Sequence, residues 1–599
     1  MDDDLTRSVE RFGAIGFATN PSFSADGERV AFISDLSGTP QVWTVASAGG
    51  WPDRVTALPD QVVDVAWSPA GDLIALNVAP GGGLNQQIYV VRPDGTGLRR
   101  LTPGGADNNR LGPWSRDGRF LHIASSRDDP AHFDAFVVSV PTNEWRAIAR
   151  TRGSANVVDV SADGRWAVLS RVVNRGDSDL YLIDIARASE VRLTPHDGKA
   201  EYRGAQYGPD GAVWCVSDDG RELGALARIP LDEGVPGRLE YVATRHDAEL
   251  ESFRLSDDGS RALLVWNLAG RSELEFFDPA SGRRWAAPQI PIDIAGRPEF
   301  SRDGRRIVFV ATGAASPTDI WTMDTGGTGR QLTHSPHPGI DLTQLVRPRL
   351  ERFEAHDGLE LTGWLYAAPG RRGPGPCVLS FHGGPEAQER PSFNRNFQAL
   401  LANGIAVFAP NVRGSAGFGK TFVHLDDLEK RFDGVRDIAS CVDHVVRVGV
   451  ADPKRIGITG GSYGGYMTMA GITEFPELFA AAVCVCGIVN FQTFFKHTQP
   501  WMAAVSKTEY GDPETQADLL RELSPIHKLD RAHTPTLVLH GANDTNVPLV
   551  EAEQMVDELR KRGVEVASVI FPDEGHGFTK TANRTRAAVE TVRWFAAHL

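Results

Sequence analysis

The spacing of apolar and polar residues divides the chain into two halves. From Asn20 to about Thr333, short apolar runs are separated by turns of the form Ser-x-Asp-Gly, and one clear copy covers Phe300–Phe309. Apolar runs bounded in this way are typical of β-strands, and Asp-Gly favours a tight hairpin turn because both residues tolerate positive φ. The first half is therefore expected to be built from hairpins.

The turns recur at nearly constant intervals. Their glycines are separated by 44, 47, 46, 47, 48 and 45 residues: Gly27, Gly71, Gly118, Gly164, Gly211, Gly259 and Gly304. A period near 45 residues with several strands per unit predicts a β-propeller, and seven turns predict seven blades. An eighth blade would need another copy before Asn20 or after Thr333, and none is recognisable there.

The pattern changes after a linker that carries Pro336, Pro338 and Pro348. Apolar runs then alternate with helical stretches near Val435–Val448, Leu549–Lys561 and Thr581–His598. This alternation predicts an α/β domain with a doubly wound, mostly parallel sheet. We expect an N-terminal segment over residues 1–19, with a helix at Asp4–Phe12 packed on the second domain, a propeller over 20–340 and the α/β domain over 341–599.

Candidate chemistry is concentrated at Gly460–Gly464, which has the form G-x-S-x-G with Ser462 at its centre. An apolar run precedes this segment and a helix-like stretch follows it, as in a nucleophile elbow. A serine hydroxyl needs a base to take its proton, and the base needs an orienting acid. Ser462 is therefore the candidate nucleophile.

Asp544 and His576 are the candidate acid and base. They follow the apolar runs Thr536–Gly541 and Val566–Phe571, in the order Ser, Asp, His that this fold uses. All three residues come just after predicted strands, where an open α/β sheet has its crevice. A chance G-x-S-x-G is common in a chain with 62 glycines, but the joint pattern favours a catalytic triad.

The loop His382–Pro385, with sequence His-Gly-Gly-Pro, follows another apolar run. Acyl transfer builds negative charge on a carbonyl oxygen, and preorganised N–H donors stabilise that charge. We expect the amides of Tyr463 and Gly384 to be these donors, although the loop could also be a simple turn.

The length and net charge of the chain disfavour some classes of binding partner. A chain of 599 residues exceeds one hydrophobic core, and its net charge of −15 without a basic block disfavours nucleic acid and anionic membranes. The five cysteines have no spacing that resembles a metal site or a disulfide framework. The acidic N-terminus is not followed by an apolar segment, which predicts a cytoplasmic protein without a signal peptide or membrane span.

A seven-bladed propeller followed by an α/β-hydrolase domain resembles the prolyl oligopeptidase family of serine peptidases. The motifs that carry the resemblance are His382–Pro385, Asn411–Gly419, Gly460–Tyr466, Asp544–Pro548 and Glu574–Phe578. The His-Gly-Gly-Pro loop is most similar to the acylaminoacyl-peptidase branch. The resemblance implies hydrolysis of short peptides through an acyl-enzyme, without metal or organic cofactor, and a propeller that excludes folded proteins.

The resemblance also implies individual roles. Ser462 would be the nucleophile, His576 the general base and then acid, and Asp544 its orienter, with Tyr463 and Gly384 in the oxyanion hole. Arg413 would lie near the active site, where it either contacts substrate or has a structural role.

The pocket residues follow less directly. We expect the aromatic region Phe491–Tyr510, with Phe491 and Trp501, to line the pocket for the residue before the scissile bond, unless these side chains are core. Many relatives have arginine where this chain has Asn546, which puts that substrate contact in doubt. The paired-glutamate loop that holds a free N-terminus in dipeptidyl peptidases is not identifiable, and Glu249 and Glu251 are interpreted as part of a solvated loop.

Three classes of function stay open. The first is a serine exopeptidase or oligopeptidase of acylaminoacyl, aminoacyl or dipeptidyl type, or a carboxypeptidase-type member of the family. The second is an esterase or amidase for a small acyl compound, which would use the same triad with a different pocket. The third, a non-enzymatic scaffold, is disfavoured by the intact triad. The sequence is compatible with a homo-oligomer.

Overall fold

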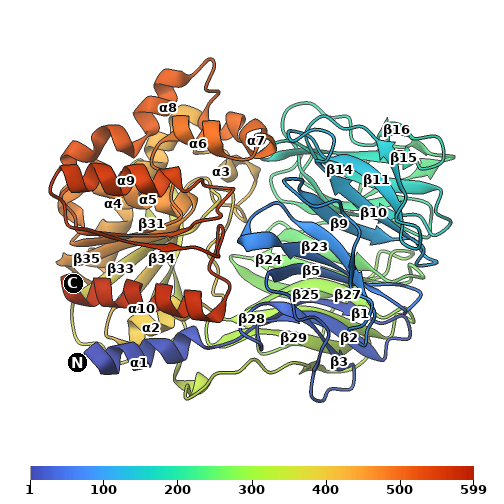
Figure 1. The fold of residues 1–599 in the computed structure, drawn as a ribbon, viewed down its shortest axis with the longest axis horizontal. Helices are drawn as coiled ribbons and strands as arrows, with labels where there is room; N and C mark the ends of the chain where they lie inside the picture. Colours follow the sequence, from blue (N-terminus) through green and yellow to red (C-terminus); the bar gives the residue numbers. More distant parts are fainter. Residues whose placement is uncertain (1) are drawn as a thin grey trace.

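The computed structural model describes residues 2–599 as a propeller packed side by side with an α/β domain (Figure 1). The propeller consists of seven four-stranded antiparallel sheets, each continuous in sequence except for one small inserted hairpin. The seven predicted blades are confirmed.

The strands of the first four blades follow one another in groups of four. They are β1 (Ala18–Phe23), β2 (Arg29–Ser34), β3 (Gln41–Ala46), β4 (Asp53–Arg54), β5 (Gln61–Trp67), β6 (Ile74–Ala79), β7 (Gln87–Val91), β8 (Arg99–Arg100), β9 (Asn109–Trp114), β10 (Phe120–Ser125), β11 (Asp134–Ser139), β12 (Trp145–Ala149), β13 (Ser154–Val160), β14 (Trp166–Asn174), β15 (Asp177–Asp184) and β16 (Ser189–Arg192).

Blades 5 to 7 complete the ring, with the small hairpin β20–β21 inserted in blade 5. Their strands are β17 (Tyr202–Tyr207), β18 (Val213–Ser217), β19 (Ala225–Ile229), β20 (Leu231–Asp232), β21 (Val235–Pro236), β22 (Glu240–Ala243), β23 (Glu249–Leu255), β24 (Ala262–Leu268), β25 (Arg271–Phe277), β26 (Arg284–Ala286), β27 (Ile294–Phe300), β28 (Arg306–Gly313), β29 (Ser316–Asp324) and β30 (Gly329–Gln331).

The repeated turn joins the first two strands of every blade. All seven predicted turn glycines have positive φ, between 66° and 83°. In the five turns with the full Ser-x-Asp-Gly sequence, the serine hydroxyl donates to the aspartate carboxylate over 2.6 Å. The turn is thus stabilised by its own side chains, which explains why it can recur without help from distant residues.

The second domain contains one eight-stranded sheet in the order β31-β32-β34-β33-β35-β36-β37-β38. The pairs β31–β32 and β32–β34 are antiparallel and the other five are parallel. The strands are β31 (Arg349–Glu354), β32 (Glu360–Tyr366), β33 (Gly375–Phe381), β34 (Ala406–Asn411), β35 (Ala451–Gly461), β36 (Ala481–Val485), β37 (Thr536–Gly541) and β38 (Val566–Phe571). This is the predicted α/β-hydrolase architecture.

Helices cover both faces of this sheet (Figure 1). Alternate residues of β33 belong to different cores, because Val378 packs with the α1, α2 and α10 side and Leu379 with the α4 and α5 side. The helices are α1 (Asp2–Gly13), α2 (Arg395–Ala402), α3 (Lys420–Val423), α4 (Arg431–Arg447), α5 (Tyr463–Glu474), α6 (Phe491–His497), α7 (Pro500–Tyr510), α8 (Ala517–Leu523), α9 (Val550–Lys561) and α10 (Thr581–His598), with short 3₁₀ turns at η1 (Pro80–Gly82), η2 (Leu342–Gln344), η3 (Leu428–Lys430), η4 (Pro476–Leu478) and η5 (Pro525–Arg531).

The chain enters and leaves the propeller through neighbouring segments. Helix α1 packs against α10 and α2, with Val9 and Phe12 buried in the hydrolase core. Blade 1 then begins at Ala18, and blade 7 ends at Gln331. The two connecting segments are joined to each other, because Gly16 N donates to the carbonyl of Pro336 over 2.9 Å.

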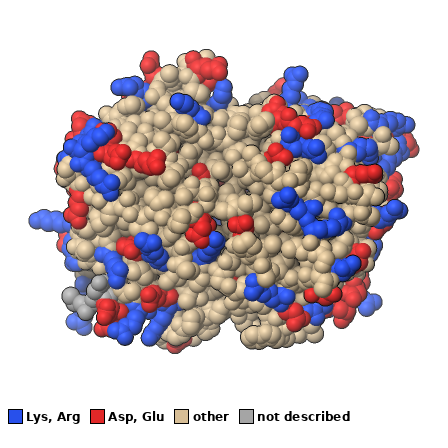
Figure 2. Space-filling model, viewed as in Figure 1, with Lys and Arg blue, Asp and Glu red and all other residues tan. Residues whose placement is uncertain are grey.

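Acidic and basic side chains are interspersed over both domains on the face seen in Figure 2. Among residues 2–599, no helix has the length and apolarity that crossing a membrane would require.

Candidate active site

Ser462 lies at the turn between β35 and α5, with φ of 57° and ψ of −121°. A non-glycine residue rarely adopts this conformation, which stores strain of the kind that clusters at functional sites. The backbone is held there because Ser462 N donates to Val485 O over 2.9 Å. At Gly464 a side chain would collide with the backbone carbonyl of Phe381 on β33, so glycine is required for α5 to pack this closely. The predicted elbow has this geometry.

Asp544 and His576 form a close pair at the same edge of the sheet. His576 Nδ1 donates to Asp544 Oδ2 over 2.7 Å. The other oxygen, Oδ1, accepts hydrogen bonds of 2.9 Å from the amides of Asn546 and Val547. These donors fix a buried carboxylate that holds the imidazole with hydrogen on Nδ1, which leaves Nε2 free to accept a proton. In the described part of the chain, Ser462 and His576 make no direct hydrogen bond.

The His-Gly-Gly-Pro loop lies against the turn that carries Ser462. A Cβ atom at Gly383 would stand 3.3 Å from Ser462 Cβ. Within this loop, His382 Nδ1 contacts Gly383 O at 2.8 Å and His382 Nε2 contacts Ser415 Oγ at 2.9 Å. The structure therefore brings Gly383 next to Ser462, with Gly384 following it in the same loop and Tyr463 following Ser462 at the start of α5.

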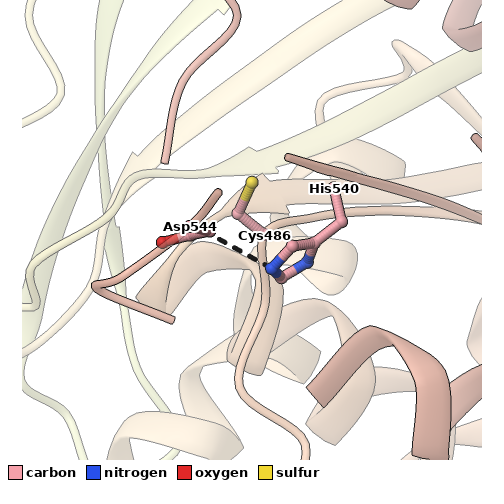
Figure 3. Close-up of side chains that lie close together, drawn as sticks. All are labelled: Cys486, His540 and Asp544. Carbon is pink, nitrogen blue, oxygen red and sulfur yellow. Dashed lines mark ion pairs between the residues drawn. The ribbon is translucent and has the colours of Figure 1, made fainter. Parts of the chain in front are cut away.

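Two further buried side chains surround the carboxylate of Asp544 (Figure 3). His540 Nε2 lies 3.4 Å from Asp544 Oδ2 and 2.9 Å from Val547 O. Burial lowers the pKa of His540, while burial and then Asp544 raise the pKa of the Cys486 thiol. A Cys–His–Asp set can bind zinc when the thiol is ionised, but burial disfavours the thiolate form of Cys486, and Asp544 is already hydrogen-bonded to His576. Cys486 and His540 thus lie against the carboxylate of Asp544, and no motif in the sequence indicates this arrangement.

The propeller reaches the same loops through the hairpin between β6 and β7. A Cβ atom at Gly82 would lie 2.6 Å from Gly575 N, next to His576. Leu84 N donates to Thr545 Oγ1 over 2.9 Å, beside Asp544. The glycine-rich hairpin thus contacts the loops of both Asp544 and His576, and no feature of the sequence indicates this contact.

Arg413 is engaged by two carboxylates. Its guanidinium contacts Asp357 at 3.0 Å through two nitrogens and Asp437 at 2.8 and 2.9 Å. Because its side chain is only 5% exposed, this geometry favours the structural alternative over a substrate contact.

The two aromatic pocket candidates lie in different surroundings. Phe491 is completely buried between Tyr466 and Tyr510, with ring centroids 5.1 and 4.8 Å away. Trp501 packs edge-on against Phe133 of the propeller at 5.6 Å. Phe491 is therefore a core residue in this structure, and Trp501 belongs to the interface between the domains.

The interpretation of Glu249 and Glu251 as a solvated loop was wrong. Both lie on strand β23, the first strand of blade 6, facing the hydrolase domain. Glu249 accepts a hydrogen bond of 2.7 Å from Gly419 N, and both oxygens of Glu251 contact Arg390 Nη1 at 2.8 Å. Exposed-looking charges on a strand can be paired across domains, which a linear sequence does not reveal.

The chain is similar to known proteins in both sequence and fold. The model of the prolyl oligopeptidase family matches residues 391–599. Dipeptidyl aminopeptidase BIII of Pseudoxanthomonas mexicana is 37% identical over 584 residues, which cover 87% of this chain and 84% of that protein. The acylamino-acid-releasing enzyme of Arabidopsis thaliana is 31% identical over 227 residues, which cover 37% of this chain and 30% of that protein.

A solved prolyl endopeptidase structure has the same fold, with a TM-score of 0.89 at 17% identity over 100% of this chain and 92% of that one. The sequence match to the dipeptidyl aminopeptidase spans both domains, so it concerns the propeller as well as the catalytic domain. The chain belongs to the prolyl oligopeptidase family of serine peptidases.

Proposed function

We propose that this chain hydrolyses short peptides through a triad of Ser462, His576 and Asp544, with the propeller restricting substrate size. The observation that carries the proposal is the 2.7 Å hydrogen bond from His576 Nδ1 to Asp544, at the sheet edge where Ser462 occupies its strained turn. A base held in this tautomer beside a projecting serine is the arrangement that acyl transfer needs.

In the proposed mechanism His576 Nε2 takes the proton of Ser462 as Oγ attacks the scissile carbonyl. The oxyanion is stabilised by the amides of Tyr463 and Gly384, and Asp544 stabilises the imidazolium. His576 then protonates the leaving amine, and an acyl group stays on Ser462. Water, activated by the same imidazole, releases the acid and restores the serine.

The N-terminal part of a peptide is the proposed recognition element. Support for the dipeptidyl type extends along most of the chain, because the dipeptidyl aminopeptidase relative covers 87% of it. Support for the acylaminoacyl type comes from a match over 37% of the chain. We therefore place the free-amino dipeptide ahead of the acetylated residue as substrate.

The test is hydrolysis of chromogenic compounds that share one apolar leaving residue, with Ser462→Ala as the blank. The compounds are a free-amino residue, a free-amino dipeptide, an N-acetyl residue, a doubly blocked longer peptide and a simple ester, together with a peptide bearing a free C-terminal carboxylate whose products are analysed. Cleavage of the free-amino dipeptide and covalent labelling of wild type by a fluorophosphonate are expected.

Two results would contradict the proposal. Activity of Ser462→Ala near that of wild type would remove Ser462 as nucleophile. Turnover of the ester alone would support the esterase alternative.

A further inference from the structure

A buried arginine, Arg431 at the start of α4, lies close to the rings of both Tyr463 and Tyr510. Its side chain is completely inaccessible to solvent. Nη1 donates to Asp426 Oδ2 over 2.9 Å, and Nη2 donates to Glu509 O over 3.1 Å and to the Glu509 carboxylate. A helix residue of this kind is normally expected at the surface, so the sequence pattern gives no sign of it.

One branch of this network leads to Tyr463, the residue after the nucleophile. The Tyr463 hydroxyl donates to Asp426 Oδ2 over 3.1 Å, so Arg431 and Tyr463 share one carboxylate oxygen. The Arg431 guanidinium also stands 5.0 Å from the centre of the Tyr463 ring. Tyr463 is thus held at its hydroxyl end, while its amide lies beside Ser462.

The other branch leads to Gly384. The Tyr510 hydroxyl donates to Gly384 O over 3.3 Å. Arg431 stands 4.8 Å from the centre of the Tyr510 ring and binds Glu509, the preceding residue. The residue that carries the second proposed donor is therefore held by a side chain that packs on the same guanidinium.

The charge of this network needs an explanation. Asp426, Asp427 and Glu509 bring carboxylate oxygens within 4.8 Å of one another. Burial raises the pKa of Asp426 to about 6 and raises that of Glu509 well above its usual range, and Arg431 opposes both changes. A buried ion pair contributes little net stability compared with apolar packing, so its position is better explained by the geometry that it imposes.

We propose that Arg431 is a positioning residue for the oxyanion hole, acting through Asp426 and Tyr463 on one side and through Tyr510 and Gly384 on the other. The inference rests on the proposed function, because it assigns a role to those two amides. Donors that face the transition state contribute only when their direction is fixed before the reaction, which is what a shared, rigid guanidinium provides.

The test uses tyrosine variants that keep the packing of the network. Tyr463→Phe and Tyr510→Phe each remove one hydroxyl, and Tyr466→Phe is the matched control. Tyr466 lies on α5, 5.4 Å from the Tyr463 ring, and its hydroxyl takes part in none of the hydrogen bonds described above. kcat and KM are measured for the panel compound that wild type cleaves, and thermal unfolding is followed for each variant.

Each of the two network variants is expected to lower kcat about tenfold with KM changed less than about twofold, because oxyanion contacts act in the transition state. Tyr466→Phe is expected to stay close to wild type. Arg431→Lys keeps the charge but loses the forked geometry, and it should lower kcat further. If Arg431→Lys does not fold, the kcat values of the tyrosine variants still test the proposed positioning role.

Unchanged kcat in Tyr463→Phe and Tyr510→Phe, an effect on KM alone, or an equal loss in Tyr466→Phe would overturn the inference. Failure of the proposed function gives a different result, because wild type would then resist the fluorophosphonate or Ser462→Ala would retain activity. Normal labelling of wild type combined with unaffected tyrosine variants would reject only the positioning role of Arg431.

Discussion

The carboxylates in the repeated turns of the propeller and the carboxylate of Glu389 in the hydrolase domain have pKa shifts of opposite sign. In blade 7, Asp303 accepts from Ser301 Oγ at 2.6 Å and from Arg305 N at 3.1 Å, and these bonds lower its pKa. In the hydrolase domain, burial raises the pKa of Glu389 to about 8. The turn aspartate finds its donors within two residues, whereas the pKa of Glu389 is shifted only by the burial that the folded hydrolase domain imposes. Because the hydrogen bonds of the turn need only neighbouring residues, the turn can recur in several blades. The catalytic site needs loops from separate segments, so it forms only once in the fold.

The largest expected effect tests the acid of the assembled site. Asp544→Asn should lower kcat about a thousandfold or more, because an amide no longer fixes the Nδ1–H tautomer or stabilises the imidazolium. Steady-state kinetics measure the change. Asp573→Asn is the control. It removes a carboxylate that binds Lys580 at 2.7 Å in the loop that leads to His576, and it should leave kcat nearly unchanged. Comparable losses in both variants would argue against a special role for Asp544.

The second-largest expected effect on kcat tests the contact between the propeller and the loop that carries His576. Gly82→Ala places a methyl group 2.6 Å from Gly575 N and should displace the His576 loop, which lowers kcat at least about tenfold. Gly105→Ala is the matched control, since Gly105 has a similar positive φ of 90° but open space around it. Equal kinetics of the two variants would show that the contact does not influence catalysis.

Glu389→Gln tests this half-buried acid through the pH dependence of protein stability. Folded Glu389 keeps its proton up to about pH 8, whereas an unfolded glutamate loses it near pH 4.3. The folded state therefore binds the extra proton between these values, and wild-type stability falls with rising pH by up to about 1.4 kcal/mol per unit. The glutamine variant lacks this loss, so its advantage in melting temperature should grow from pH 5 to pH 8. A constant difference, or the same trend in the exposed control Glu354→Gln, would contradict the assignment.

The smallest effect concerns a single repeated turn. Ser301→Ala removes the hydroxyl that binds Asp303 and Arg306 N, and it should lower the free energy of unfolding of the propeller by about 1 kcal/mol without affecting kcat. In blade 2 the corresponding turn has Ala70 in place of the aspartate, so Ser68→Ala should cost less. Thermal melts of both variants provide the measurement, and equal losses would mean that the aspartate adds nothing.

These contrasts explain what could be predicted from the sequence. The blades were predictable because each turn is closed by residues five positions apart or fewer, and the elbow because its glycines and serine are contiguous. The partners of Arg413 could not be predicted, since Asp357 and Asp437 come from segments on either side of it. The burial of Phe491 and the contact of Trp501 with Phe133 likewise depend on packing between segments far apart in the chain.

The hydrogen bond between Gly16 and Pro336 has a mechanical consequence. The chain leaves the hydrolase domain and returns to it at adjacent points. The two connecting segments beside blades 1 and 7 therefore form a single hinge between the domains. Rotation about such a hinge moves the opposite side of the ring by the longest lever arm. That side is blade 4, where Arg175 binds Glu386 at 2.7 Å. The Arg175–Glu386 ion pair is therefore one of the interdomain contacts that such a rotation would lengthen most.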